Sequence, residues 1–202
     1  KGATIGHGLS ATPEMVWFKR RNASAGWAVY NKDLTDNGYA LLLNDAAAQD
    51  NRNTQFLNET SPSSTLITLG DWNEANAGSN YVAYAFHSVE GYSKIGSYTA
   101  TANANGPFVY TGFQPAWLLI KAINGTQNWN IYDNKRSVGG ASPNDIELYA
   151  DLAAVEYDSG RDVDFLANGF KIKTVNYVNL SGGEYIYMAF AKNPFKYATG
   201  IL

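Results

Sequence analysis

An internal repeat constrains the fold of this chain more than any other feature of its sequence. The segment PEMVWFKRRNASAGWAVYNKDL, which begins at Pro13, aligns without a gap with PAWLLIKAINGTQNWNIYDNKR, which begins at Pro115, at an offset of 102 residues. Further along, NYVAYAFHS aligns with EYIYMAFAK at an offset of 104 residues. Self-similarity at a fixed period marks a structural unit that occurs more than once. We therefore predict two tandem copies, residues 1–95 and 96–202, packed as one rigid unit with pseudo-twofold similarity.

The second copy begins with a strand-like segment, residues 96–100, that has no counterpart in the first copy. GATIGHGL at 2–9 aligns with GPFVYTGF at 106–113, so the counterpart of that segment would lie before Lys1. We expect from this that the chain is part of a longer polypeptide.

Short runs rich in β-branched and aromatic residues recur along both copies and indicate an all-β fold. Gly, Asn, Asp, Ser or Pro separates these runs, at the spacing typical of sandwiches and barrels. MVWF and WLLI read as strands buried on both faces, whereas TLITL and FKIKT alternate as half-buried strands do. NASAG at 22–26 and NGTQN at 124–128 predict hairpins in which Asn and Gly take positive φ. We expect two sandwich-like halves with little helix, at most a turn or two in 44–51 and 147–157.

Composition excludes several classes of function. The formal net charge of -3 and the sequence pI of about 5.3 provide no positive surface for phosphates, so we expect no nucleic-acid partner. The absence of cysteine excludes a disulfide framework, a thiolate zinc site and a cysteine nucleophile. The longest apolar runs are strand-sized and fall far short of the roughly 20 residues that cross a bilayer. We therefore expect no membrane insertion, and KGATIGHG at the start has no signal-peptide pattern.

No group of residues forms a motif specific for catalysis. His7 and His87 stand outside any HExxH pattern, and we interpret them as surface or capping side chains. Asp162 and Asp164 share a strand face and would suit a glycan depolymerase if two acids lay about 5 to 10 Å apart. Acids in such positions more often protect a sheet edge from pairing. We therefore expect no enzyme activity, no cofactor and no metal.

The repeat sorts the aromatic residues into two groups. Those present in both copies are expected in the shared core: Trp27 with Trp129, Tyr30 with Tyr132, Tyr81 with Tyr185, and Phe86 with Phe190. Two equivalent loops, 71–76 and 175–179, each carry one unmatched aromatic residue among asparagines, which suits sugar recognition by a ring face and amide hydrogen bonds. The candidate ligand-binding residues are Trp72, Asn73, Glu74, Asn76, Asn176, Tyr177 and Asn179. The alternative is a pair of ordinary turns with an aromatic side chain folded back on the sheet.

The blocks GATIGHGLSATPEMVWFKRR, VEGYSKIGSYT, GPFVYTGF and YIYMAFA with PFKYA are distributed along nearly the whole length of the chain, from residue 2 to residue 198. Together they resemble a two-copy domain near the C-terminus of phage tail-fibre and tail-spike-like proteins. The resemblance implies a virion component that binds a host-surface receptor, a glycan or a protein, alongside other tail proteins and often as a trimer. The family offers no catalytic motif to carry over. A purely structural role, as a knob, capsid decoration or assembly domain, and a glycan depolymerase are the alternatives.

Overall fold

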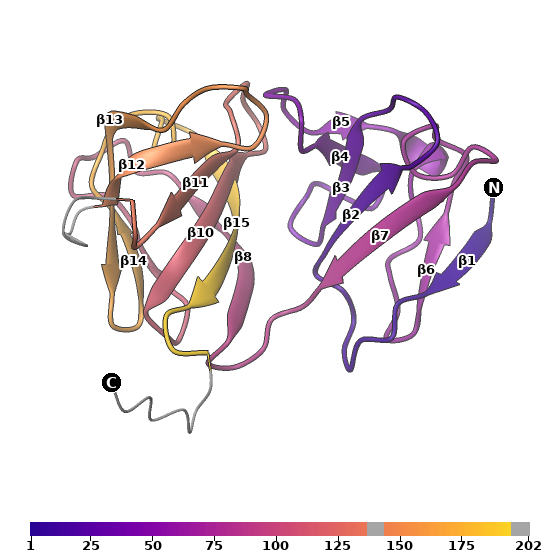
Figure 1. Ribbon diagram of the computed structural model, residues 1–202, viewed down its shortest axis with the longest axis horizontal. Helices are drawn as coiled ribbons and strands as arrows, with labels where there is room; N and C mark the ends of the chain where they lie inside the picture. Colours follow the sequence, from indigo (N-terminus) through magenta and orange to yellow (C-terminus); the bar gives the residue numbers. More distant parts are fainter. Residues whose placement is uncertain (137–143, 195–202) are drawn as a thin grey trace. The chain divides into compact units, whose positions relative to one another are not determined.

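The structure is a computed structural model that describes residues 1–136 and 144–194 (Figure 1). The chain divides into two compact units, unit 1 (Lys1–His87) and unit 2 (Ser88–Leu202). Over the described residues, both units consist of β-strands and loops, with one short 3-10 helix in unit 1, so the all-β prediction is confirmed. The expected boundary between residues 95 and 96 falls inside a strand of unit 2, β8 (Ser93–Thr99).

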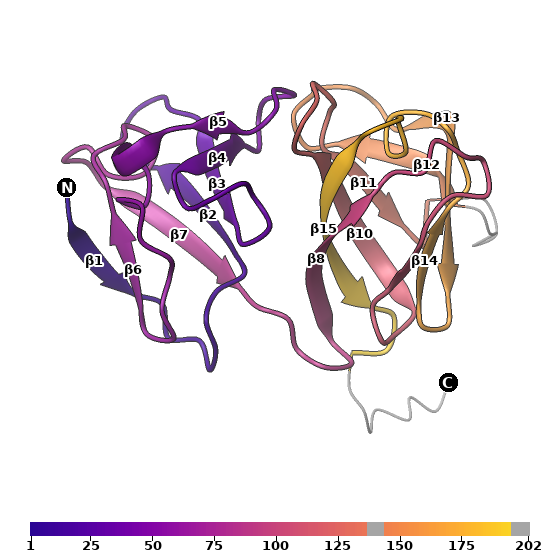
Figure 2. The ribbon, with the colours of Figure 1, turned by 180° about the vertical axis from the view of Figure 1, so that it is seen from behind.

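Unit 1 has two sheets, whose strands are shown in Figures 1 and 2. Its elements are β1 (Ala3–Gly6), β2 (Met15–Arg20), β3 (Trp27–Asn31), β4 (Tyr39–Leu42), β5 (Asp50–Asn51), η1 (Asn53–Gln55), β6 (Leu66–Leu69) and β7 (Tyr81–Phe86). One sheet has the order β5-β4-β3-β2-β7, and the other pairs β1 with β6. The core lies between them, because Ile67 and Leu69 of β6 share a buried cluster with Val16, Phe18 and Tyr30. Unit 1 is therefore sandwich-like.

Unit 2 has one longer sheet that turns back on itself. Its strands besides β8 are β9 (Phe108–Tyr110), β10 (Pro115–Ala122), β11 (Asn130–Asp133), β12 (Asn144–Tyr149), β13 (Tyr157–Leu166), β14 (Gly169–Ile172) and β15 (Glu184–Ala191). The strand order is β8-β15-β10-β11-β12-β13-β14-β9. Val109 of β9 and Phe170 of β14 join Ile120 of β10 and Tyr187 of β15 in one buried cluster, so the two ends of the sheet enclose the core.

The same pairings surround the central strand of each unit. Met15 of β2 lies opposite Phe86 of β7, and Trp117 of β10 lies opposite Phe190 of β15. These are pairs that the sequence repeat aligns with each other. A duplication predicts such agreement; the duplication itself, the pseudo-twofold similarity and the rigid packing of the copies stay predictions.

The burial of the strands follows the hydrophobic patterns. β2 and β10 are central strands, and three of the four residues in each of their continuous apolar runs, MVWF and WLLI, are buried. β6 alternates between exposed or half-buried and buried positions, as TLITL predicts. An alternating hydrophobic pattern therefore marks the half-buried strand β6, and a continuous apolar run marks the central strands β2 and β10.

The stretches 44–51 and 147–157 contain no helical turn, which agrees with the expectation of little helix, at most a turn or two in each. Asn44 accepts a hydrogen bond from the backbone N–H of Trp27 at 2.7 Å, and Asp151 accepts one from the N–H of Trp129 at 3.0 Å. Side-chain bonds of this kind compete with helical hydrogen bonds. Asn44 and Asp151 therefore bond the backbone of the neighbouring hairpin and do not start a helix.

Both predicted hairpins form, between β2 and β3 and between β10 and β11. The expected positive φ is wrong, because no residue of either loop has one. A lysine bonds each loop instead: Lys19 Nζ donates to the carbonyl of Ala25 at 2.6 Å, and Lys121 Nζ donates to that of Gln127 at 2.8 Å. The loops are long enough to close in ordinary backbone conformations.

Half of the aromatic residues matched between the copies are buried as expected. Tyr30, Trp129, Tyr132 and Tyr185 have at most 5% of their surface exposed. Trp27, Tyr81, Phe86 and Phe190 are only half-buried, so the core prediction is wrong for them. Trp27 stacks on the exposed ring of Tyr84 with centroids 6.4 Å apart, which places it on the outer face of β3.

Candidate functional site

The loop before β7 folds back on the core of unit 1. The Trp72 ring meets Phe56 edge-on with centroids 5.5 Å apart, and the Arg52 guanidinium lies 4.6 Å from the Trp72 ring centroid. Trp72 is half-buried against the core cluster, which is the arrangement that the alternative interpretation of this loop predicts. The loop presents no open aromatic face of the kind that sugar stacking requires.

The three polar candidates of this loop differ in their surroundings. Asn76 is half-buried and its side-chain Nδ2 donates to the carbonyl of Gly70 at 2.8 Å. Asn73 is exposed, and its Oδ1 accepts a hydrogen bond from Arg20 at 2.6 Å. Glu74 is half-buried. Asn76 therefore supports the loop, whereas Asn73 lies at the surface.

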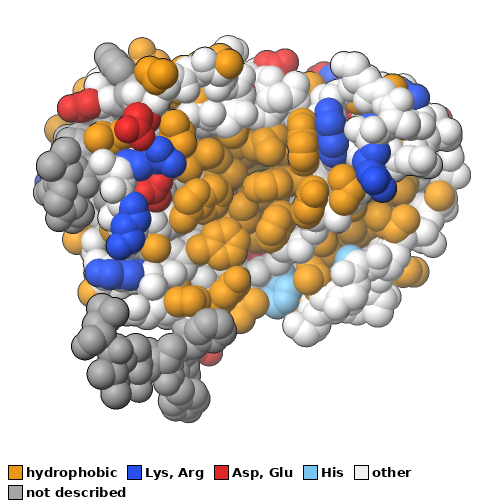
Figure 3. All heavy atoms as spheres, in the orientation of Figure 1, with side chains coloured by type: hydrophobic (Ala, Val, Ile, Leu, Met, Phe, Trp, Pro, Cys, Tyr) orange, Lys and Arg blue, Asp and Glu red, His pale blue; other side chains and the backbone are white. Residues whose placement is uncertain are grey.

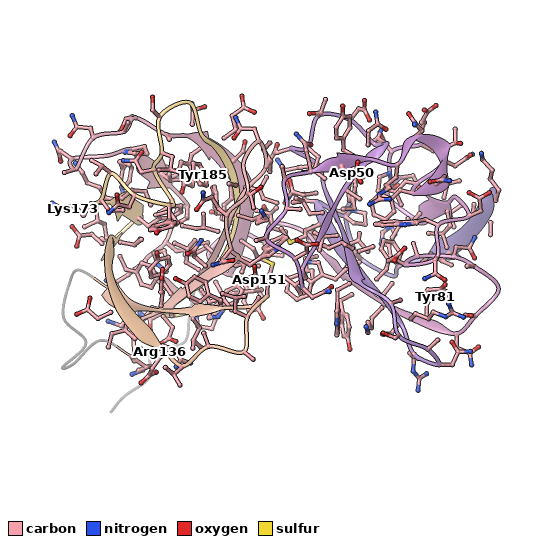
Figure 4. All side chains as sticks on the ribbon, turned by 90° about the horizontal axis from the view of Figure 1, so that it is seen from above. Asp50, Tyr81, Arg136, Asp151, Lys173 and Tyr185 are labelled. Carbon is pink, nitrogen blue, oxygen red and sulfur yellow. The ribbon has the colours of Figure 1, made fainter. Side chains whose placement is uncertain are left out.

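A tyrosine hydroxyl anchors this loop. Tyr81, labelled in Figure 4, donates to the carbonyl of Asn73 at 2.7 Å and accepts a hydrogen bond from the N–H of Ala77 at 3.0 Å. A tyrosine that bonds the backbone a few residues upstream recurs at the corners of β-sandwiches. The arrangement fixes the loop at the end of the sheet.

Tyr185 anchors the loop before β15 in the same way (Figure 4). Its hydroxyl donates to the carbonyl of Tyr177 at 2.7 Å and accepts a hydrogen bond from the N–H of Leu180 at 3.1 Å. Burial raises the pKa of Tyr185, so the hydroxyl keeps its proton in the folded protein. The two predicted ligand loops are thus anchored alike in their separate units.

Asn179 occupies the centre of the loop in unit 2 and is fully buried. Its Oδ1 accepts hydrogen bonds from the N–H groups of Thr101 and Ala102 at 2.8 and 3.3 Å. Its Nδ2 donates to the carbonyls of Asn103 and Thr174 at 2.8 and 2.7 Å. An amide side chain offers two acceptor and two donor positions, and all four are used. Asn179 therefore connects two loops of the fold and has no bond left for a ligand.

Tyr177 and Asn176 lie at the surface beside that buried residue. The Tyr177 side chain is 44% exposed, and its backbone φ is +26°. Positive φ is uncommon for a bulky residue and persists where surrounding bonds hold it. The Tyr185 hydroxyl and the Asn179 network supply those bonds. Of the three unit 2 candidates, two are therefore exposed on a firmly held loop.

A polar cavity in unit 1 was not predicted from the sequence. It has a volume of about 190 Å³ and is lined by Asp36, Asn37, Gly38, Asn51, Asn53 and Glu59. The cavity joins the DNG turn before β4 to the segment around η1, which the sheet brings together. The turn signature was readable in the sequence, but its proximity to residues 51–59 depends on the tertiary fold.

The backbone around this cavity is held in an uncommon conformation. Asn53 and Glu59 have φ of +48° and +52°, and neighbouring Asn58 has φ of +53°. Left-handed residues other than glycine cost energy and gather at functional sites. The Asn53 amide and the Glu59 carboxylate make no hydrogen bond or ion pair with other described side chains. Both groups are exposed and can face a ligand.

Arg52 connects the cavity to the Trp72 loop. It lies between two cavity residues in the sequence, pairs with Asp50 at 2.6 Å, and covers the Trp72 ring. The predicted loop 71–76 therefore supports the cavity indirectly, because its Trp72 ring packs against Arg52 beside the cavity.

The remaining sequence candidates give no further site. Asp164 lies on β13, and the side chain of Asp162 lies outside the described part of the chain. His7 Nε2 lies 3.2 Å from the carbonyl of Ser63, and His87 Nε2 lies 3.3 Å from Ser10 Oγ. Among the residues that the structure describes, no group of three or more His, Cys, Asp or Glu could hold a metal ion.

The fold defines a sandwich-like all-β protein of two compact units. Residues 1–194 match the family model described as a domain of unknown function, DUF7483, and the chain belongs to this family. No curated protein and no solved structure gives a significant match to the chain. None of the helical segments in the described residues has the length and apolar character that crossing a membrane requires.

Proposed function

We propose that the chain is a non-enzymatic attachment module of a phage virion that binds a glycan on the host-cell surface. The virion assignment, with other tail proteins as partners and a trimeric fibre, rests on the sequence resemblance alone. The glycan-binding part rests on the polar cavity of unit 1. The two parts are separable, and each has its own test below.

The observation that carries the binding proposal is the pair of unpaired polar groups in that cavity. Asn53 and Glu59 present an amide and a carboxylate from backbone positions whose φ is positive. Sugar hydroxyl groups both donate and accept, and an amide together with a carboxylate satisfies both roles. Because the backbone already holds these groups, a ligand spends little conformational entropy in ordering them.

The dimensions of the cavity define the size of the ligand group. A volume of about 190 Å³ is smaller than the roughly 300–1,000 Å³ of sites for drug-sized ligands. The cavity suits one sugar ring of a longer chain that continues over the surface. Affinity for an isolated monosaccharide should therefore be weak, and binding to a polymeric surface glycan should gain from repeated contacts.

The exposed ring of Tyr177 is a second contact, in unit 2. Its apolar face and the neighbouring Asn176 amide provide the stacking and hydrogen bonding expected of a sugar-binding loop. This loop retains two of the residues predicted from the sequence, whereas the unit 1 site shifts from the Trp72 loop to the cavity beside it.

The test compares binding of purified host-surface polysaccharide to the wild-type chain and to two cavity variants. Asn53→Gly removes the amide while keeping a residue that adopts positive φ, and Glu59→Gln removes the charge while keeping the shape. Glu59→Gln should weaken binding about tenfold or more, because hydrogen bonds to charged groups contribute about 1.5–3 kcal/mol. Asn53→Gly should weaken binding several-fold, because a hydrogen bond between neutral groups contributes about 0.5–1.5 kcal/mol. The melting temperature should stay within about a degree of wild type, since neither side chain bonds another residue in the described part of the chain.

Asn22→Ala, at an exposed asparagine of the β2–β3 hairpin, is the matched control and should bind as wild type. If the isolated chain binds no host polysaccharide, and phages carrying both cavity variants adsorb normally, the attachment proposal is wrong and a structural role is favoured. Loss of binding after protease treatment of the host surface would identify a protein receptor instead. Release of reducing sugar, abolished by Asp164→Asn, would contradict the non-enzymatic assignment.

A further inference from the structure

Strand β7 ends one sheet of unit 1 and leaves one side without a partner. Figures 1 and 2 show β2 along one side of β7, and no described strand pairs with the other. The N–H of Arg21 donates to the carbonyl of Asn80 at 2.8 Å. The alternation of an antiparallel ladder therefore turns the backbone groups of Tyr81, Ala83 and Ala85 away from β2.

This edge lacks the features that protect edge strands from pairing. Its sequence, YVAYAF, contains no charge and no proline, and Ala83 and Tyr84 are exposed. Native proteins normally protect such edges with charged residues, proline or a covering segment. β5, at the opposite edge of the same sheet, carries Asp50 and is followed by its ion-pair partner Arg52. The β7 edge is therefore built for pairing, in contrast to the β5 edge.

An apolar groove opens beside β7, between the two sheets of unit 1. It has a volume of about 250 Å³ and is lined by Ile5, Phe18, Leu69, Ala75, Asn76, Ser79, Tyr81 and Ala83. Hydrophobic side chains reach the surface of unit 1 beside β7 and β6 (Figure 3). A dry cavity of about 150 Å³ admits benzene, so this groove has room for an aromatic side chain.

Unit 2 shows what occupies the equivalent place there. β8 pairs with β15 along the side that corresponds to the open side of β7, with Tyr98 opposite Tyr185. The Tyr98 ring stacks on Tyr185 at 5.0 Å, meets Phe170 edge-on at 6.1 Å, and its hydroxyl donates to the carbonyl of Val178 at 2.7 Å. The core cluster that contains Tyr98 also contains Val109, Ile120 and Tyr185. In the sequence repeat these three residues align with the groove residues Ile5, Phe18 and Tyr81.

We propose that the β7 edge and its groove receive one further antiparallel β-strand of the β8 type. The occupant is a segment of the same polypeptide leading into Lys1, because β8 leads into β9 through a short connection and β1 is the counterpart of β9. A short covalent connection gives the strand a high effective concentration at the groove. The strand places an aromatic side chain opposite Tyr81 and bonds the outward backbone groups of Tyr81, Ala83 and Ala85.

The groove also specifies a residue of this strand that differs from β8. In unit 2, Tyr187 lies opposite Gly96, and a Cβ on Gly96 would meet the Tyr187 hydroxyl oxygen at 2.9 Å. Unit 1 has Ala83 in place of Tyr187. In unit 2 the large residue, Tyr187, is on β15 and the small one, Gly96, is on the neighbouring strand. In unit 1 the small residue, Ala83, is on β7 and leaves space for a large one on the incoming strand. The strand should therefore carry a large apolar residue opposite Ala83.

The first experiment uses the 202-residue chain and the peptide SKIGSYTAT, which has the sequence of 93–101. The Gly96→Leu form of the peptide should bind wild-type chain roughly tenfold or more tightly than the unchanged peptide, because it buries a leucine side chain. The chain variant Ala83→Tyr, made at an exposed site, should reverse this preference. A Tyr98→Ser peptide should bind neither chain measurably. Calorimetry gives the affinities, and hydrogen exchange should show protection of the Ala83 and Ala85 amides on binding.

The second experiment tests the source of the strand by placing the sequence of 93–105, with Gly96→Leu, before Gly2. The extended chain should remain monomeric, unfold at a higher temperature than the 202-residue chain, and no longer bind the peptide. Dimers formed by strand exchange would overturn the intramolecular source. The proposal that the groove binds the strand would be wrong if the wild-type and Ala83→Tyr chains each bound both peptide forms with equal affinity. It would also be wrong if the peptide bound without protecting the β7 amides. Neither experiment involves a glycan, so its failure is distinct from failure of the proposed function.

Discussion

Replacing Asn179 with alanine should destabilise unit 2 by about 3–5 kcal/mol, although the residue lies three positions from an asparagine whose removal should cost almost nothing. Asn179→Ala removes four hydrogen bonds to the backbone. The bond to the Thr174 carbonyl is buried, and leaving such a group unsatisfied costs about 1–3 kcal/mol. The other three groups are partly accessible to water and contribute about 0.5–1 kcal/mol each.

Asn176→Ala is the matched control, because its side chain is exposed. Exposed substitutions of this kind usually change stability by less than about 0.5 kcal/mol. Urea unfolding at fixed pH measures both values by linear extrapolation. For a unit of this size, Asn179→Ala should also lower the melting temperature by roughly 10–20 °C. A loss below about 1 kcal/mol, or an equal loss in both variants, would refute the argument that the buried network supports the loop.

Tyr185→Phe removes the hydroxyl that joins two points of the same loop, which should cost about 1–2 kcal/mol and accelerate hydrogen exchange at the Leu180 amide; unchanged exchange would contradict the anchoring role. Burial, with smaller contributions from Asp33 and Glu14, raises the pKa of Tyr30 to about 12. Because the unfolded chain loses this proton first, stability should fall by roughly 2 kcal/mol as pH rises from 10 to 12. Tyr30→Phe should remove that part of the slope, and an unchanged slope in alkaline unfolding curves would contradict the assignment.

The sequence predicts the strands well, because their hydrophobic pattern records which faces are buried. The central strands β2 and β10 have continuous apolar runs, and β6 alternates. The alanine-rich stretches 44–51 and 147–157 were the best candidates for a short helical turn, because alanine favours helix. The structure has non-helical turns there, because Asn44 and Asp151 bond the backbone of the neighbouring hairpin. Local composition cannot reveal a hydrogen bond to a partner distant in sequence.

The candidate site was less predictable for the same reason. Asn176 and Asn179 are chemically identical, and only the tertiary fold makes one exposed and the other fully bonded. The cavity around Asn53 depends on three residues with positive φ and on the approach of the turn before β4. Asparagine favours positive φ more than most residues, but the sequence does not show which of its many asparagines adopts it, and glutamate gives no such signal. A pattern can therefore locate a loop but cannot assign the role of each polar residue in it.

Tyr81 and Tyr185 show how far the predicted equivalence of the two units extends. Both hydroxyls make the same pair of bonds to the loop before their strand. Their burial differs: Tyr185 is 1% exposed, whereas Tyr81 is half-buried and lines an open groove. The difference arises because β8 covers the edge of β15 and no described strand covers the edge of β7. Matched residues thus predict matched local bonds, whereas burial depends on which strand lies alongside. If the proposed strand binds at β7, Tyr81 should become as buried as Tyr185.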